Sequence, residues 1–145
     1  MWMVVGDGAV ESERRPKTGD TEKITINLGY VDLGQIDLLV QEGFYSNRTD
    51  LIRTAIRNQL DRHGEALRQS VVRHHFELGL REFTKPQLEK IRDDGEQLHI
   101  QVLGLAVIAP DVSPQLALQT IAAIHVLGAL QASPAVKAAL GDRIR

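Results

Sequence analysis

Residues 23–28 (Lys-Ile-Thr-Ile-Asn-Leu) alternate strictly between polar and apolar side chains. This alternation, rich in β-branched residues, predicts a short β-strand with Ile24, Ile26 and Leu28 on one face. No partner strand follows nearby, because helical periodicity begins directly after it. A lone strand leaves its backbone N–H and C=O groups unpaired and does not persist in water. The most economical partner is therefore the same strand of a second molecule.

Two helices are predicted after this strand. The first covers about residues 31–42 and ends at Gly43, a residue type that suits the backbone after a helix. Asn47 occupies an N-cap position for the second, and Asp50 resembles the acid of a capping box. Gly64 is expected to end or kink the second helix. The predicted apolar stripes contain Leu33, Ile36, Leu39 and Val40, and then Leu51, Ile52, Ala55, Ile56 and Leu60.

Two-fold symmetry makes a ribbon of two such strands antiparallel. Its apolar face is expected to pack on the four helices of the two chains. Its polar face presents Lys23, Thr25 and Asn27 twice, and a two-stranded ribbon fits the major groove of DNA. The predicted dimer core consists of Ile24, Ile26, Leu28, Leu33, Ile36, Val40, Leu51, Ile52 and Ile56.

Residues 22–62 resemble the ribbon-helix-helix family of bacterial transcription regulators, the CopG/Arc/MetJ group, and in part ParD-type antitoxins. The resemblance rests on the strand KITINL, the helix LGQIDLLVQEG, the turn GFYSNRTD and the helix LIRTAIRNQL. It departs from the family at Gly29, where a proline often follows the strand. It implies base contacts by the polar strand residues Lys23, Thr25 and Asn27.

The start of the second helix is the predicted phosphate-binding site. Its backbone N–H groups and positive dipole end suit a DNA phosphate, and the resemblance maps this role onto Asn47, Arg48 and Thr49. Arg53 and Arg57 lie one turn apart and either flank the phosphates or are ordinary surface charges. The charge of this region gives limited support for DNA binding, because residues 22–68 carry six basic and seven acidic side chains.

The second half of the chain contains an internal repeat. Residues 100–112 (IQVLGLAVIAPDV) and 124–136 (IHVLGALQASPAV) align without gaps at an offset of 24. Each repeat predicts a strand, a turn with proline and a short helix, and alternation of strands with helices favours parallel pairing. The single glycine inside each strand predicts a bulge or a close-packing position. We expect three such units, with strands near 71–82, 98–108 and 123–131 and helices at 85–93, 113–121 and 133–140.

These patterns predict an α+β protein in three parts. A flexible arm covers residues 1–21, a ribbon-helix-helix covers 22–66, and a small β/α repeat domain for oligomerisation or effector binding covers 70–145. The repeat strands are so aliphatic that they need cover on both faces. We therefore expect this domain to self-associate through a strand edge or an apolar face, which joins dimers into a tetramer or a larger assembly.

Enzyme, metal and cofactor functions are not expected. The chain has no cysteine, and its five histidines show no chelating spacing. His74 and His75 would point to opposite faces of a strand. Ser133, His125 and Asp142 have no reason to converge into a triad, since Ser133 is placed to cap a helix. No apolar run approaches the roughly 18 residues of a membrane span, and we expect a cytoplasmic protein.

The sequence therefore predicts a homo-oligomeric, sequence-specific DNA-binding regulator, acting as a repressor. One alternative is an antitoxin, whose C-terminal part would wrap a toxin partner. Such tails are usually polar and fold on binding, whereas residues 98–140 are aliphatic and repeated. The other alternative is a structural self-assembly protein in which both halves serve self-association.

Overall fold

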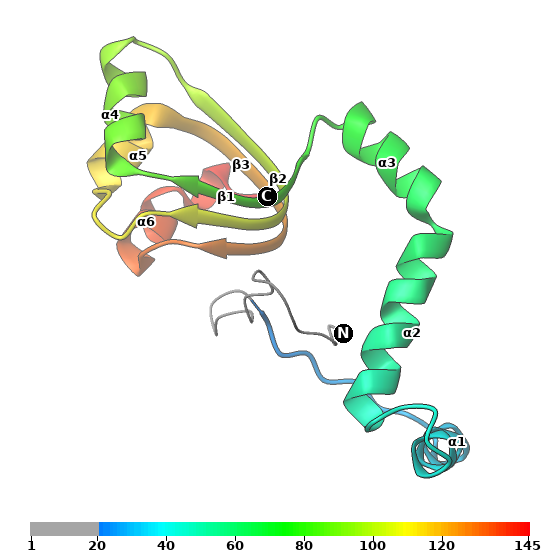
Figure 1. The fold of residues 1–145 in the computed structure, drawn as a ribbon. Helices are drawn as coiled ribbons and strands as arrows, with labels where there is room; N and C mark the ends of the chain where they lie inside the picture. The colour runs from blue at the N-terminus through cyan, green and yellow to red at the C-terminus, as the bar shows by residue number, and fades with distance from the viewer. Residues whose placement is uncertain (1–20) are drawn as a thin grey trace. The chain divides into compact units, whose positions relative to one another are not determined.

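The computed structural model describes residues 21–145, which form two compact units (Figure 1). The first ends at Leu67 and the second begins at Arg68. The arm expected over residues 1–21 lies outside the described residues except for its last position. The mixed helix and strand content confirms the predicted α+β class.

The first unit contains an irregular segment and two helices, α1 (Tyr30–Gln41) and α2 (Arg48–Arg62). Gly43 has a φ of +88° and follows α1, as predicted. Its N–H donates to the Val40 carbonyl at 3.1 Å, and the Phe44 N–H donates to the Leu39 carbonyl at 3.0 Å. This pair of bonds is a Schellman motif, which satisfies the last carbonyls of α1 and turns the chain towards α2.

Residues 21–29 form neither helix nor strand in the single chain. The predicted strand at 23–28 therefore has no hydrogen-bonded partner here. The physical reason is that a β-strand requires hydrogen bonds to an adjacent strand. The three strands of the described residues all lie in the second unit and form one sheet there, so none of them pairs with residues 23–28. Pairing of 23–28 between two molecules stays a prediction.

A third helix, α3 (Gly64–Arg73), was not predicted. The strand expected from residue 71 begins only at Glu77, so its first part is wrong. Val71 and Val72 have strand propensity, but they end a run of helix-forming residues that starts at Glu65. Gly64 interrupts the helical path, as expected, since α2 ends at Arg62 and α3 begins two residues later.

The second unit alternates strands with helices. Strands β1 (Glu77–Phe83), β2 (Leu98–Ile108) and β3 (Ile121–Gln131) form one sheet in the order β1-β2-β3. Both pairings are parallel, as predicted. The helices are α4 (Lys85–Asp93), α5 (Pro114–Thr120) and α6 (Pro134–Ala139), followed by the 3-10 helix η2 (Gly141–Arg143). The side chains of Thr84, Ser113 and Ser133 cap these three α-helices, and each has a proline in its first two positions.

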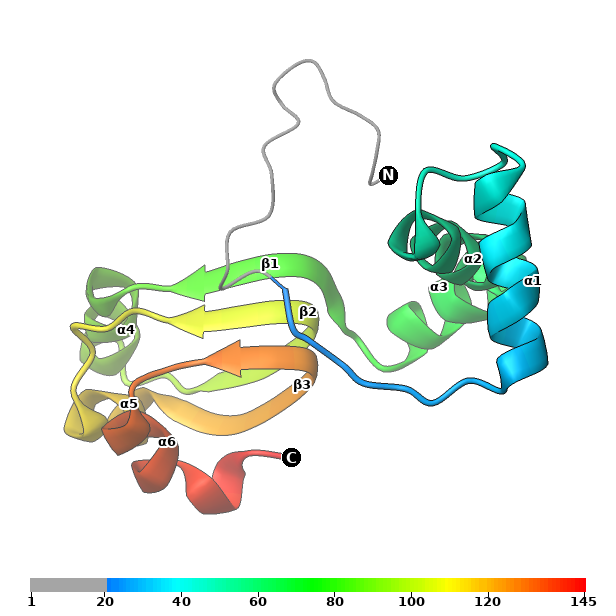
Figure 2. The same ribbon diagram turned by 90° about the horizontal axis from the view of Figure 1, so that it is seen from below.

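Three glycines stand at one level across the sheet. The register pairs Gly79 with Gly104 and Gly104 with Gly128, and their φ angles are +117°, +139° and +126°. A Cβ at Gly104 would overlap the carbonyl oxygen of Gly79, and one at Gly128 would overlap that of Gly104. The predicted close approach is thus confirmed. We call this row of three glycines the glycine crease. Strands β2 and β3 fold back along their length (Figures 1 and 2).

The crease makes each repeat one coil of a short stack. A coil consists of one strand and the helix that follows it. The helices close the side opposite the bend (Figure 2). Residues 24 positions apart in the sequence are neighbours in the sheet, since Ile100 pairs with Ile124 and Val102 with Val126. The sequence repeat therefore matches the pairing register of β2 and β3. Each coil packs on its neighbours, as in repeat proteins.

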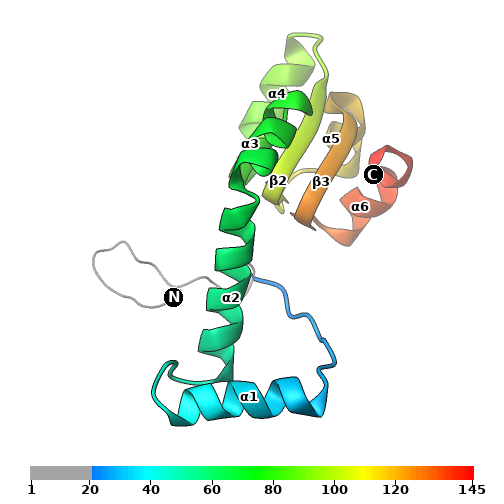
Figure 3. The ribbon, with the colours of Figure 1, turned by 90° about the vertical axis from the view of Figure 1, so that its right-hand side faces the viewer.

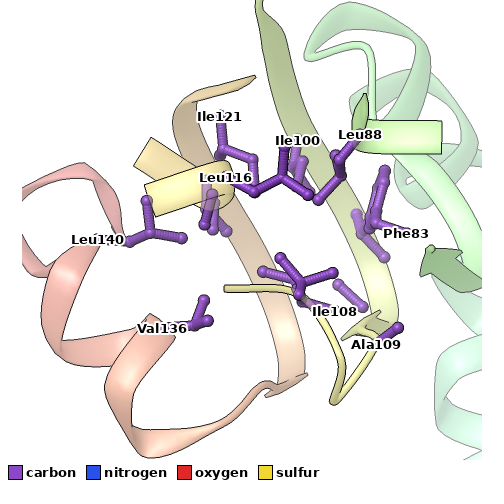
Figure 4. Close-up of a cluster of buried hydrophobic side chains, with 14 residues drawn as sticks. Phe83, Leu88, Ile100, Ile108, Ala109, Leu116, Ile121, Val136 and Leu140 are labelled. Atoms are coloured by element: carbon purple, nitrogen blue, oxygen red, sulfur yellow. The ribbon is translucent and has the colours of Figure 1, made fainter. Parts of the chain in front are cut away.

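The hydrophobic core of the described chain lies wholly in this second unit (Figure 4). It fills the space between the folded strands and the helices. Leu88, Ile121 and Leu140 are completely buried, and no described residue before Phe83 is buried. The full set is Phe83, Leu88, Ile100, Val102, Ala106, Ile108, Ala109, Val112, Leu116, Ala117, Ile121, Ile124, Val136 and Leu140.

Candidate nucleic-acid interface

The segment before α1 exposes both of its faces. The polar residues Lys23, Thr25 and Asn27 are exposed, as base-reading residues must be. The apolar residues are exposed too, with Ile24 at 73%, Ile26 at 60% and Leu28 at 41%. Polar and apolar side chains alternate here, and burial of one row would leave the other in water. The single chain buries neither row.

The helices of this unit also lack a completed core. Figure 3 shows α1 lying across the N-terminal end of α2. Within this pair, the predicted core residues of both stripes are only half-buried, and Ile56 remains 48% exposed. Because α1 and α2 contribute no buried residue, their apolar stripes need cover from outside the single chain. The half-buried predicted core residues are Leu33, Ile36, Val40, Leu51 and Ile52.

The predicted phosphate site begins at Asn47, which caps α2. Its side-chain oxygen accepts from the Asp50 N–H at 2.8 Å, and the Asp50 carboxylate accepts from the Ser46 N–H at 2.9 Å. The N-cap is thus confirmed, whereas Asp50 bonds the N–H of Ser46 and not that of Asn47, so the capping box is not completed. The Asn47 oxygen is therefore occupied, and the first-turn N–H groups at Arg48 and Thr49 are the groups that a helix leaves for a phosphate. Both of these residues are exposed.

Arg48 has a partner that sequence analysis missed. Its Nε donates to one oxygen of Asp37 at 2.7 Å, and its Nη2 donates to the other at 2.8 Å. This bidentate hydrogen bond lowers the pKa of the Asp37 carboxyl and raises the pKa of the Arg48 guanidinium. The pair links α1 to the start of α2. It also engages the Nε and Nη2 groups of Arg48, which would otherwise donate to a phosphate. No local spacing signals it, because the two residues belong to different helices.

Arg53 is exposed on α2. It lies five positions after Arg48, about 140° around the helix, and four positions after Thr49, about 40° around it. The structure therefore brings Asn47, Arg48 and Thr49 together at one helix end, with Arg53 one turn further along on the side of Thr49. Its phosphate contact stays a prediction.

We expect Asp37→Asn to strengthen binding to any DNA duplex. The substitution removes a negative charge and releases Arg48 to a phosphate, which predicts a gain of roughly three- to tenfold at low salt. The plot of log affinity against log salt should steepen by up to about 0.9 per released arginine. Fluorescence anisotropy at several salt concentrations measures both quantities.

Asp61→Asn is the matched control, because it makes the same charge change at an exposed site near the end of α2. Equal effects of the two variants would mean that net charge alone is responsible. Weaker binding by Asp37→Asn would show instead that Asp37 orients Arg48 for its phosphate.

The histidines pack against an aromatic ring or lie in solvent. The His125 ring meets Phe76 edge-on with centroids 5.0 Å apart, and His74 lies 6.2 Å from the same ring. Among the described residues, no group of three metal-ligating side chains is close enough to hold an ion. None of the helices in this part of the chain is long and apolar enough to cross a membrane.

Comparison with known proteins agrees with the geometry of the first unit. A family model described as the ribbon-helix-helix transcriptional regulator family matches residues 19–137. The chain belongs to this family. The match extends well beyond the 22–62 resemblance and takes in most of the second unit. No curated protein and no solved structure gives a significant match.

Membership defines the general activity. Regulators of this kind bind DNA, form dimers and control transcription, and they are generally not enzymes. In this chain, the apolar row of residues 24–28 is exposed and α1 and α2 have no buried residue.

Proposed function

We propose that two chains pair their 23–28 segments into an antiparallel ribbon that reads a specific operator through the major groove. The observation that carries this proposal is the exposure of Ile24, Ile26 and Leu28 beside two helices that lack a core. Pairing turns all three apolar side chains of each chain onto the helices. The same pairing turns Lys23, Thr25 and Asn27 outwards, where their donors and acceptors meet base edges.

Phosphates fix the ribbon in the groove. The N-terminus of α2 follows the ribbon by way of α1, and its first N–H groups with Arg48 form one clamp per chain. The two-fold axis places a second clamp on the opposite side of the ribbon. The operator should therefore be a two-fold symmetric sequence. Occupation of such a site within a promoter would repress transcription.

The second unit joins dimers in this proposal. Its completed core supports an ordered, permanent module, in contrast to a tail that folds only on a toxin. A tetramer would engage two half-site pairs together, and this linkage raises affinity through effective concentration without new base contacts.

Thr25→Ala and Asn27→Ala should relax sequence preference while the dimer remains folded. Each substitution removes base-edge hydrogen bonds, which are worth about 1–3 kcal/mol of discrimination per good contact. Selection from a random duplex library should enrich a symmetric motif with the wild type and a degenerate motif with either variant.

Arg48→Ala provides the contrast, because loss of a phosphate contact weakens binding to all sequences about equally. Unchanged motifs from both strand variants would exclude base reading by the 23–28 segment.

A further inference from the structure

The two ends of the coil stack differ in how their edge strands are covered. At the β3 end, Ile144 forms a bridge with Ile124, and the Arg145 N–H donates to the Ile124 carbonyl at 2.9 Å. The Arg143 guanidinium donates to the carbonyls of Leu118 and Ile121 at 2.8 and 2.7 Å. The C-terminal residues thus cover this edge at Ile124, while Leu127 further along β3 remains 49% exposed.

The β1 end has no such cover. Within residues 21–145, only β2 pairs with β1. Leu78 is 76% exposed and Leu80 is 58% exposed, whereas their register partners Leu103 and Leu105 in the next coil are half-buried. In repeat proteins, polar terminal repeats prevent separate molecules from associating. An exposed apolar edge strand instead promotes pairing with a strand of another molecule.

The backbone of β1 is oriented for a further strand. The Gly79 carbonyl faces Gly104 in β2, because a side chain at Gly104 would collide with it. In a trans peptide the N–H points opposite to the carbonyl, so the Leu80 N–H points to the open edge. β1 contains neither the proline nor the lysine that often blocks an exposed edge.

We propose that β1 pairs antiparallel with β1 of a second copy of this chain, about a two-fold axis at Gly79. This register places Leu78 opposite the partner's Leu80 and Glu77 opposite the partner's Arg81. The cross-strand pairs are then apolar with apolar and acid with base, each formed twice. Shifting the axis to Leu78 or Leu80 pairs that leucine with its own copy but no longer places Glu77 opposite Arg81, so only the axis at Gly79 gives both kinds of match.

Arg81 and Glu77 are available for this exchange. They now form an ion pair within one chain, with Nε and Oε2 at 3.0 Å, and both side chains remain about half-exposed. When two β1 strands pair, Glu77 of each chain can bond Arg81 of the other chain in place of, or in addition to, its own Arg81. The inference rests on the proposed function in one respect, because the β1 contact is taken to join one ribbon dimer to another.

Charge reversal tests the contact in the full-length protein. Glu77→Arg and Arg81→Glu each place like charges opposite one another and should halve the mass measured by analytical ultracentrifugation. Mixing the two variants should restore the wild-type mass, because the two basic side chains of the first variant then face the two acidic side chains of the second. The pair within each chain stays broken in the mixture, so restoration reports only the contact between chains.

Arg92→Glu is the matched control, since it breaks an exposed ion pair with Asp93 elsewhere in the same unit. It should leave the mass unchanged. Single variants with the wild-type mass, or a mixture that fails to recover it, would overturn the proposal and leave the edge to another occupant.

Cysteine cross-linking gives an independent measurement, because the chain has no cysteine of its own. Leu78→Cys and Leu80→Cys should form a disulfide-linked pair when mixed and oxidised, and each should form far less alone. Absence of a cross-link specific to the mixture would contradict the Gly79-centred register. Both tests are independent of DNA binding, so failure of the operator proposal would leave their outcome unaffected.

Discussion

Replacing Ile26 with aspartate is expected to split the ribbon dimer and abolish DNA binding. In the proposed dimer this side chain is buried in both chains, so each copy loses about 1.5–3 kcal/mol of apolar burial. Each copy also places a carboxylate in an apolar core, which adds a larger penalty. Together these effects predict a rise of more than about 1,000-fold in the dimer dissociation constant. The mass in solution should halve.

Thr25→Asp is the matched control for this prediction. It introduces the same charge at the neighbouring position, on the opposite face of the segment. The dimer should survive, because that face is in water, but DNA binding should be lost through repulsion by the phosphates. If both variants keep the wild-type mass, residues 23–28 do not form the dimer.

The second large effect is expected at the glycine crease. Gly104→Ala should destabilise the second unit by about 3–5 kcal/mol, because a φ of +139° is unfavourable for any residue with a Cβ and the added carbon overlaps the Gly79 carbonyl. Circular dichroism during thermal unfolding measures the loss. Leu88 and the other core residues depend on the folded strands, so they should become exposed together.

Two other glycines separate the contributions. Gly95 has a φ of +70° but open space around it, so Gly95→Ala should cost only about 1–2 kcal/mol of conformational strain. Gly141 has neither a positive φ nor a neighbour, and Gly141→Ala should be close to neutral. A Gly104→Ala variant as stable as Gly141→Ala would show that the strands tolerate a Cβ at the crease.

Most elements were predictable because local signals agreed. The bounds of β2 and α4 match the prediction, since a gapless repeat and a Thr-Lys-Pro helix start define them. The caps at Asn47 and Ser133 were equally clear from spacing. The missed helix α3 shows the opposite case, because Val71 and Val72 carried a strand propensity that their helical neighbours overrode.

Long-range features could not be predicted for a different reason. The Arg48–Asp37 pair depends on how α1 crosses α2, and no residue spacing encodes that crossing. The glycines at 104 and 128 were identified as special positions, but their alignment with Gly79 requires the register of β1. The open edge of β1 likewise became visible only when the strand order was known.

Whether the ribbon reads an operator is decided by DNA binding to the region upstream of the protein's own gene. Fluorescence anisotropy would compare this duplex with a scrambled duplex of equal composition at several salt concentrations. We predict tight binding that prefers the native duplex and weakens steeply with salt, as phosphate contacts require. Equal binding to both duplexes, or none at low salt, would contradict this prediction.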